Sequence, residues 1–147
     1  MSASVSPRVV FERLVEGISQ RRWHELHKLY AEDAAIDYPF AVPRLRLDGR
    51  AAIRRYFAAV ARAPLDLRAH NIVVHATGDP EVVVGEYDYD GRVTTTGRTF
   101  QVSNIQVSRI RGGLIVTSRD YHNHLVLAGA IGRLAELVSA LDIDARS

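Results

Sequence analysis

A carboxylate and two imidazoles occupy alternate positions near the end of the chain, within the segment from Gly112 to Gly132. Side chains in a strand alternate between two faces. In a regular strand, one face here carries Val116, Ser118, Asp120, His122 and His124, and the other carries Ile115, Thr117, Arg119, Tyr121 and Asn123. Carboxylates and imidazoles can transfer protons in catalysis. Because the strand begins with apolar residues, we expect the face with Asp120 to form the floor of a sheltered cavity.

Each of these side chains also has a purely structural interpretation. Asp120 can be a carboxylate paired with an arginine of a neighbouring strand, such as Arg68 or Arg109. A histidine in the position of His122 can serve only as a hydrogen-bond partner for a carboxylate or a backbone carbonyl. The two interpretations differ in whether the side chains reach a cavity.

Metal binding is a further alternative for the histidines. His70 could join Asp120 and His122 as ligands, and His24 and His27 are three positions apart, a spacing that can seat a metal. Spacing alone does not show that the first three converge, and the second pair has no third ligand nearby. We therefore expect neither a metal nor a cofactor.

Composition limits the function classes. The 147 residues, of which 47% are hydrophobic, predict a single domain spanning 1–147. The chain has no cysteine, which excludes disulfides, thiolate metal sites and cysteine nucleophiles. No apolar run reaches the ~20 residues of a membrane span, and the first residues lack a signal peptide's apolar centre, so we expect a cytoplasmic protein without a membrane partner. The basic residues are scattered, so we expect no nucleic-acid partner.

The first half of the chain predicts three helices and a short strand. Ser6 and Pro7 are a typical N-cap and first position for a helix, and a second helix is expected over 22–30. Residues 34–40 predict a strand with Ile36 and Tyr38 on one face, ended by Pro39. A loop or edge segment then leads to a helix over 49–63.

The second half predicts four long strands over 67–76, 81–89, 99–111 and 114–124, followed by a closing helix interrupted or bounded by Gly129 and Gly132. The turn signals TGDP, DYDG with the following GRVTTTG, and RGG favour antiparallel hairpins. Faces with mixed polarity are Arg68, His70, Ile72 and Val74; Val82, Val84, Glu86 and Asp88; and Phe100, Val102, Asn104, Gln106 and Ser108. The opposite faces are also mixed, so the inward side stays open. Helices followed by strands predict the α+β class.

Three segments carry a family resemblance: LYAEDAAIDYPF, DGRAAIRRYF, and VSRIRGGLIVTSRDYHNH with the following LAGAIG. With the order of elements, they make the chain resemble the SnoaL-like and ketosteroid-isomerase-like branch of the nuclear transport factor two superfamily. The resemblance covers most of the chain. It implies a cone-shaped α+β barrel, in which a curved antiparallel sheet wraps around the N-terminal helices and encloses an apolar pocket. It also implies a homodimer.

Two enzyme types of this superfamily match poorly. In the ketosteroid isomerases that this chain resembles, a proton-shuttling Asp occupies the position that matches Tyr38. Asp37 is one residue away and therefore on the other face of the strand, so the base of those enzymes is missing here. The Asp of their oxyanion hole is replaced by Asn104. Limonene epoxide hydrolase is similar at Asp120 and Asp88, but Glu86 stands where its arginine is expected. Two acids without the cation would raise each other's pKa.

SnoaL-type polyketide cyclases match better, because they resemble this chain in having an Asp on the last long strand, where Asp120 lies. The resemblance implies that Asp120 is the general base of an aldol ring closure. His122 is on the same predicted face and an imidazole titrates near neutral pH, so we expect it to assist as an auxiliary acid. The tail YHNHLVLAGAIG is also similar to the phenazine biosynthesis A/B family. Candidate substrate-binding residues are Tyr38 and Asn104, as hydrogen-bond donors to an oxyanion, and Asp88, Trp23, Phe57 and His70.

Two functions follow as hypotheses. The first is the binding of a small hydrophobic, carbonyl-bearing metabolite with cofactor-independent acid/base chemistry of the cyclase, isomerase or dehydratase type. The second is a non-catalytic ligand-binding or dimerisation module of the same fold. If Trp23, Tyr38 and Phe57 fill the pocket, the second is favoured.

Overall fold

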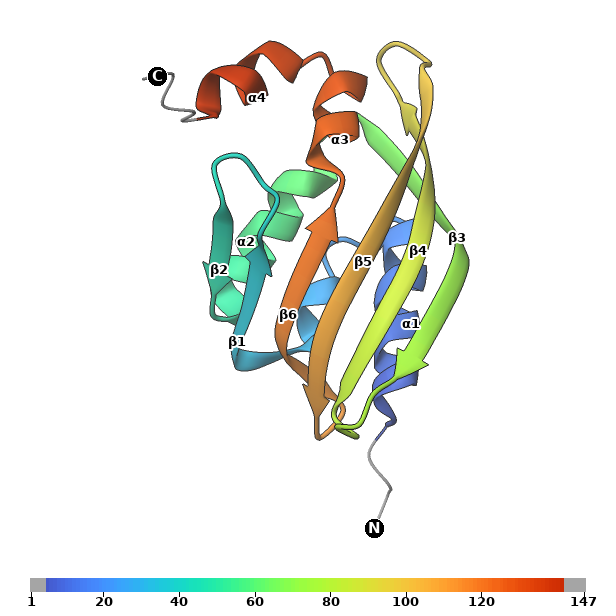
Figure 1. The fold of residues 1–147 in the computed structure, drawn as a ribbon, viewed down its shortest axis with the longest axis vertical. Coiled ribbons are helices and arrows are strands. Elements are labelled where there is room, and N and C mark those ends of the chain that lie inside the picture. Colours follow the sequence, from blue (N-terminus) through green and yellow to red (C-terminus); the bar gives the residue numbers. More distant parts are fainter. Residues whose placement is uncertain (1–4, 142–147) are drawn as a thin grey trace.

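Helices and strands follow one another in the order that the sequence predicts (Figure 1). The computed structural model describes residues 5–141. Its helices are α1 (Pro7–Ser19), the 3₁₀ helix η1 (Leu26–Leu29), α2 (Arg50–Ala61), α3 (His124–Ala130) and α4 (Leu134–Ala140). Its strands are β1 (Tyr30–Tyr38), β2 (Leu45–Asp48), β3 (Leu65–Ala76), β4 (Val82–Val93), β5 (Thr99–Arg111) and β6 (Leu114–His122). The α+β class is thereby confirmed.

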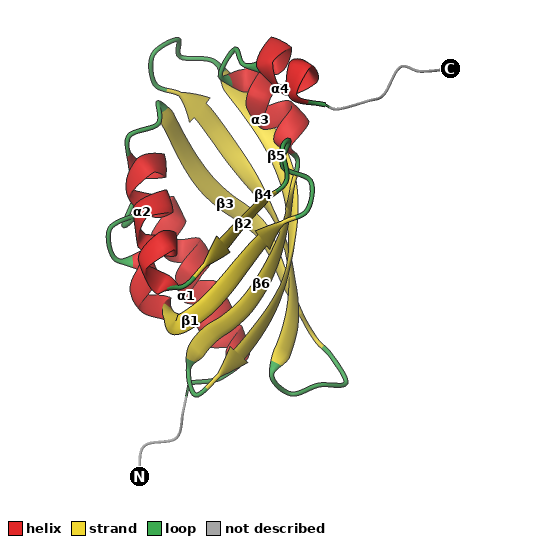
Figure 2. Cartoon of the chain, turned by 90° about the vertical axis from the view of Figure 1, so that its left-hand side faces the viewer, coloured by secondary structure: helices red, strands yellow, loops and turns green. Residues whose placement is uncertain are grey.

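The six strands form one curved sheet in the order β2-β1-β6-β5-β4-β3, with α1 and α2 on one side of it (Figure 2). β1 pairs with β6 in parallel, while the other neighbours pair antiparallel. The sheet is therefore mixed and open, which corrects the prediction of a purely antiparallel sheet, although the cone-shaped α+β architecture holds. The parallel pair arises because the first strand follows the helices directly and joins the last strand, with a long connection between them.

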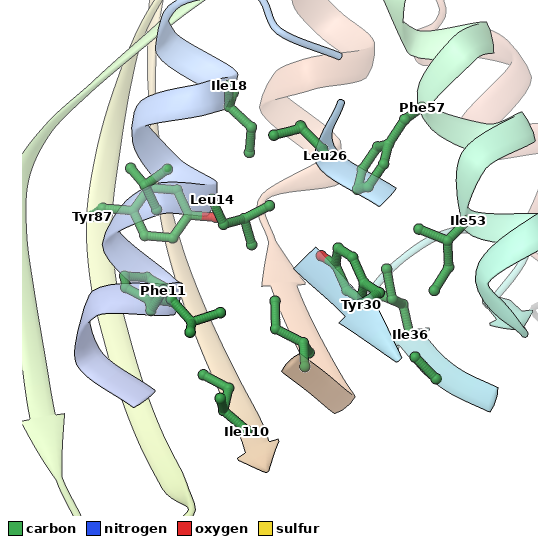
Figure 3. Close-up of a cluster of buried hydrophobic side chains, with 14 of the residues drawn as sticks. Phe11, Leu14, Ile18, Leu26, Tyr30, Ile36, Ile53, Phe57, Tyr87 and Ile110 are labelled. Atoms are coloured by element: carbon green, nitrogen blue, oxygen red, sulfur yellow. The ribbon is translucent and has the colours of Figure 1, made fainter. Parts of the chain in front are cut away.

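The core lies between α1, α2 and the sheet (Figure 3). The Ser6 hydroxyl caps α1 by accepting from the Val9 N–H, and Pro7 is the first helical residue, as predicted. The apolar stripe of α1 that is fully buried consists of Val10, Phe11, Leu14, Val15 and Ile18. From α2, Ile53 and Phe57 are buried in the same hydrophobic cluster. Each element thus contributes the apolar face that its periodicity indicates.

Three predicted boundaries are wrong. The helix expected over 22–30 is only the short η1, because the chain is already extended at Tyr30, which pairs with Ile115 of β6. The motif DYDG is not a turn but lies inside β4, where Gly91 makes room for the Phe100 ring. The last strand ends at His122, because the Asn123 side chain caps α3 and His124 is its first residue.

A bulge in β6 changes the predicted face of its first residues. Arg109 of β5 is paired with Thr117, but the next residue, Ile110, is paired with Ile115, so Val116 is the extra residue. Ile115 consequently faces the core together with Asp120, rather than away from it as alternation predicts. Beyond the bulge, normal alternation brings Ser118 and Asp120 to the inner face, so the inward orientation of Asp120 agrees with expectation.

No helix in residues 5–141 has both the length and the apolar character required to cross a membrane.

Candidate functional site

Asp120 is buried on the inner face of β6, with 4% of its surface exposed. The Ser118 hydroxyl donates to its Oδ1 at 2.5 Å, and the Gln106 side chain also hydrogen-bonds to it. Burial raises the pKa of Asp120 from its ordinary 3.8 to about 6, against the opposing effect of these two bonds. Arg109 does not pair with it, because that guanidinium binds Asp79 and Glu81, and Arg68 is exposed.

Strand register explains why these polar groups meet. Gln106 of β5 lies opposite Asp120, and Ser108 lies opposite Ser118, with their hydroxyl oxygens 3.0 Å apart. Residues opposite each other in an antiparallel pair share a face, so all four side chains turn to the interior. The result is a row of buried polar groups that satisfy one another next to an apolar core.

The polar row continues to a histidine through a tyrosine of β4. The Tyr87 hydroxyl donates to Gln106 Oε1 at 2.7 Å and lies 3.3 Å from His122 Nε2. Tyr87 and Gln106 are each 2% exposed, and burial raises the pKa of Tyr87 well above its ordinary value. Asp120 and His122 are therefore connected by hydrogen bonds through Gln106 and Tyr87, in addition to their closeness in sequence.

His122 and its neighbour His124 are neutral at physiological pH. Burial lowers the pKa of each from 6.5 to about 4. Tyr38 from β1 contacts both imidazoles edge-on, with ring centroids 5.7 Å from His122 and 6.3 Å from His124. Such neutral imidazoles can accept a proton, whereas an imidazolium cannot.

Asn104 is the least satisfied polar side chain of this region. It is 3% exposed and lies between Tyr87 and His122 in the register of β4, β5 and β6. Neither its amide nitrogen nor its amide oxygen has a hydrogen-bond partner among the described residues. His124 Nε2 is likewise buried without a partner among them. Unpaired buried polar atoms are costly, and a ligand that pairs with them is one explanation of their retention.

A cavity of about 640 Å³ lies at these residues. Its lining draws on both faces of the sheet: Tyr87, Asn104 and His122 face inward, and the outer-face residues that alternate with them, together with residues at the start of α3, supply the rest. Its lining residues are Phe40, Asn71, Val73, Glu86, Tyr87, Asp88, Ser103, Asn104, Ile105, Tyr121, His122, Asn123, His124 and Leu125. Asp120 is not among them, so it does not form the floor of this cavity, whereas His122 and Asn104 are lining residues. The volume is in the range of small-molecule sites.

The remaining predicted substrate-binding residues are dispersed. Trp23 and Phe57 pack on each other in the core, with ring centroids 6.1 Å apart, and do not line this cavity. His70 lies on the outer face of β3, with Nδ1 3.3 Å from a carboxylate oxygen of Asp90. Asp88 is on the same outer face and accepts hydrogen bonds from Asn71 and Ser103 at the cavity rim.

A larger hollow, of about 900 Å³, lies elsewhere, between η1 and α2. Lys28, Arg50, Arg54 and Arg55 line it, and its one acid is Glu32. It contains none of the predicted site residues and no group positioned for proton transfer except His27, whose pKa is lowered by burial and by the surrounding cations. We therefore place the candidate site at the cavity beside His122. Within residues 5–141 no cluster of three or more potential metal ligands is found.

Sequence reasoning did not select Tyr87 and Gln106 as site residues. Gln106 was on the same predicted face as Asn104, so alternation alone could have drawn attention to it. For β4 the sequence left the inward face open, and the predicted site residue Asp88 lies with Glu86 on the outer face. A better indication of the inward face was the pair Gly85 and Gly91, which lie on the same face as Tyr87 and Tyr89 and on either side of them. Each of the two glycines makes room for an aromatic ring.

Sequence comparisons identify relatives across most of the chain. The model of the SnoaL-like domain family matches residues 11–118. The uncharacterised protein YesE of Bacillus subtilis is 33% identical over 118 residues, which cover 76% of both proteins. An uncharacterised PhzA/B-like protein of Pseudomonas aeruginosa is 29% identical over 131 residues, or 86% of this chain and 90% of that protein.

Solved structures with the same fold include proteins to which activities have been assigned provisionally. A proposed isomerase of Bacillus subtilis superposes with a TM-score of 0.79 at 28% identity, covering 86% of this chain and 93% of that one. A proposed polyketide cyclase of Xanthomonas campestris superposes with a TM-score of 0.71 at 23% identity, covering 87% and 96%. The second similarity concerns the fold alone.

Proposed function

Because the chain belongs to the SnoaL-like domain family, we propose that it binds a small, hydrophobic, carbonyl-bearing metabolite at the 640 Å³ cavity and transfers protons on it without a cofactor. The observation that carries this proposal is the buried Asn104 amide, which has no hydrogen-bond partner within residues 5–141 and lies beside the neutral His122. An amide N–H donor at that position fits a carbonyl oxygen. The apolar rim residues Phe40, Ile105 and Leu125 fit the hydrocarbon part of such a ligand.

The reaction begins with removal of a proton from the carbon next to the carbonyl. His122 accepts that proton, so the C–H bond breaks, an N–H bond forms, and the electron pair moves onto the carbonyl oxygen as an enolate. The Asn104 N–H groups stabilise the oxygen as its charge develops. The conjugated enolate then takes the proton back from His122 at a different carbon, which is isomerisation. Alternatively its carbon attacks a second carbonyl carbon of the ligand, and the alkoxide that forms takes the proton from His122, which is an aldol cyclisation.

This proposal exchanges the expected roles of the acid and the histidine. Asp120 was expected as the base, but its carboxylate is occupied by Ser118 and Gln106, and it does not line the cavity. His122 does line it. We therefore assign the proton transfer with the ligand to His122, and Asp120 acts through it as a positioning residue.

Deuterium exchange tests the proposal directly. The protein is incubated in D₂O with a simple aromatic 1,3-diketone, 1-phenylbutane-1,3-dione, and loss of the proton between the two carbonyls is followed by NMR. The wild type should accelerate exchange, and His122→Asn and Asn104→Leu should reduce the acceleration by about a hundredfold, the usual size of such contributions. His24→Asn, at an exposed histidine outside the cavity, should behave as wild type. Exchange equal in the wild type and His122→Asn would refute the assignment.

A second candidate function is a non-catalytic module for ligand binding or dimerisation. Two observations favour it: Trp23, Tyr38 and Phe57 fill the interior as core residues, and α4 exposes Leu134 and Val138 to 44% and 56%. A homodimer seen by light scattering, together with thermal stabilisation by the diketone but no exchange, would support this function instead of catalysis.

A further inference from the structure

Four side chains on three strands form a hydrogen-bond series from Asp120 through Gln106 and Tyr87 to His122. We infer that Gln106 and Tyr87 are positioning residues that hold His122 in its Nε2–H form and so leave Nδ1 free to accept a proton. The catalytic consequence rests on the proposed function, but the tautomer itself can be measured without any ligand.

The Asp120 carboxylate determines which group donates and which accepts in each hydrogen bond of the series. Ionised Asp120 can only accept hydrogen bonds, so the Gln106 group that bonds to it must be the amide N–H₂. The other end of the amide is then the carbonyl oxygen Oε1, which faces Tyr87 at 2.7 Å. An oxygen acceptor of this kind requires a donor, and the hydroxyl of Tyr87 supplies it.

The Tyr87 hydroxyl has one proton, and its 2.7 Å bond to Gln106 Oε1 uses it, so the neighbouring Tyr89 hydroxyl, which also bonds to Tyr87, must donate in that contact. At 3.3 Å from His122 Nε2 the Tyr87 oxygen can therefore act only as an acceptor. The proton of that contact must belong to the imidazole, which places N–H at Nε2. A neutral imidazole carries a single N–H, so its Nδ1 keeps a lone pair.

Burial makes this arrangement specific. Gln106 and Tyr87 are each 2% exposed, so water cannot easily supply an alternative partner to either. Reversing the Gln106 amide would point its oxygen at a carboxylate and its N–H₂ at a hydroxyl that must then donate elsewhere. Such a reversal places two buried acceptors, Gln106 Oε1 and the ionised carboxylate, against each other with no proton between them, which is unfavourable.

The inference predicts an inverted tautomer when Gln106 loses its amide. In Gln106→Met the Tyr87 proton no longer has its acceptor, so the hydroxyl turns to donate to His122 Nε2, and the imidazole proton moves to Nδ1. In Tyr87→Phe no hydroxyl is present to donate to His122 Nε2 or to accept from it, so both tautomers of His122 should appear. A role in packing alone would not invert the tautomer, because Met has nearly the volume of Gln.

Long-range ¹H–¹⁵N NMR of the histidine-labelled full chain at neutral pH reads the two imidazole nitrogens. We expect Nε2–H in the wild type and in the control Gln101→Leu, whose amide bonds Asp90 on the outer face, and Nδ1–H in Gln106→Met. The diketone exchange rate should fall about tenfold or more in Gln106→Met. A wild type with Nδ1–H overturns the inference even if the variants fail to fold, as does a folded Gln106→Met with an unchanged tautomer. If the wild type has Nε2–H on His122 but catalyses no deuterium exchange, the proposed function is refuted, while the inference about the tautomer stands.

Discussion

Phe11 of α1 lies directly over Gly85 of β4: a methyl group placed on Gly85 would be 2.1 Å from Cζ of the Phe11 ring. The absence of a side chain at Gly85 allows the helix to approach the sheet where Tyr87 begins the polar series, and the Phe11 and Tyr87 rings meet edge-on at 5.9 Å. Helix packing and the position of the site tyrosine thus depend on the same glycine.

Gly85→Ala should therefore destabilise the protein by about 1–3 kcal/mol, as overpacking of a core typically does. Urea unfolding measures the change. Gly78→Ala is the matched control, because a methyl group there meets nothing within 4 Å. The added Phe11→Leu substitution should recover part of the loss by removing the clashing ring atoms. Equal unfolding midpoints for Gly85→Ala and the wild type would contradict the observed contact.

Replacing Asn104 by Leu should stabilise the ligand-free protein while it weakens ligand binding. The buried amide has no partner among the described residues, and relieving such a group is worth about 1–3 kcal/mol. Gln106→Leu is the informative contrast, since its amide is bonded and its loss should destabilise. Chemical denaturation of both variants decides the point, and a destabilised Asn104→Leu would mean that the amide is satisfied in solution.

The raised pKa of Asp120 predicts that this residue opposes folding as the pH rises. The folded state holds its proton up to a pKa of about 6, while the unfolded state releases it near 3.8, so stability from this group is lost between those values. At 1.36 kcal/mol per pH unit the loss is roughly 3 kcal/mol. Asp120→Asn should remove this dependence and be the more stable protein at pH 7. Unfolding free energies of both proteins that run parallel from pH 4 to 6 would exclude the buried carboxylate.

The histidine gives the opposite pH dependence. The folded-state pKa of His122 is lowered to about 4, so between pH 6.5 and 4 the unfolded chain binds the extra proton and stability falls as the pH decreases. In His122→Asn the loss of unfolding free energy between pH 6.5 and 4 should be smaller by roughly 3 kcal/mol, which is the equivalent of the pKa difference. His24→Asn is the control, because that histidine is exposed. Stability measured by urea unfolding at several pH values provides the comparison, and identical slopes for both variants would argue against burial of His122.

Local periodicity was sufficient for the elements whose apolar positions repeat regularly. The apolar residues from Val10 to Ile18 recur at helical spacing and form the buried face of α1, and Ser6 with Pro7 predicted its start, because capping is a local interaction. The end of the last strand could not be found in this way. His124 continues the alternation in sequence, and only the Asn123 side chain bonded to the Val126 N–H shows that a helix has begun.

The site was predictable in part for the same reason. Asp120 and His122 were selected because their residue types can transfer protons, and their inward face followed from alternation after the bulge. The bulge itself, at Val116, leaves no mark in the sequence because the residue is an ordinary strand former. The link between Asp120 and His122 depends on the registers of β4, β5 and β6, which place Tyr87 beside Asn104 and Gln106 opposite Asp120.

The position of β6 between β1 and β5 has a consequence for biosynthesis. A ribosome makes β1 and β2 early and the β3–β4–β5 meander later, and these two groups of strands have no direct pairing with each other. Only when residues 114–122 emerge can the two halves be joined. The strand that carries Asp120 and His122 is thus also the last piece needed to complete the sheet, so the sheet cannot close before this strand has left the ribosome.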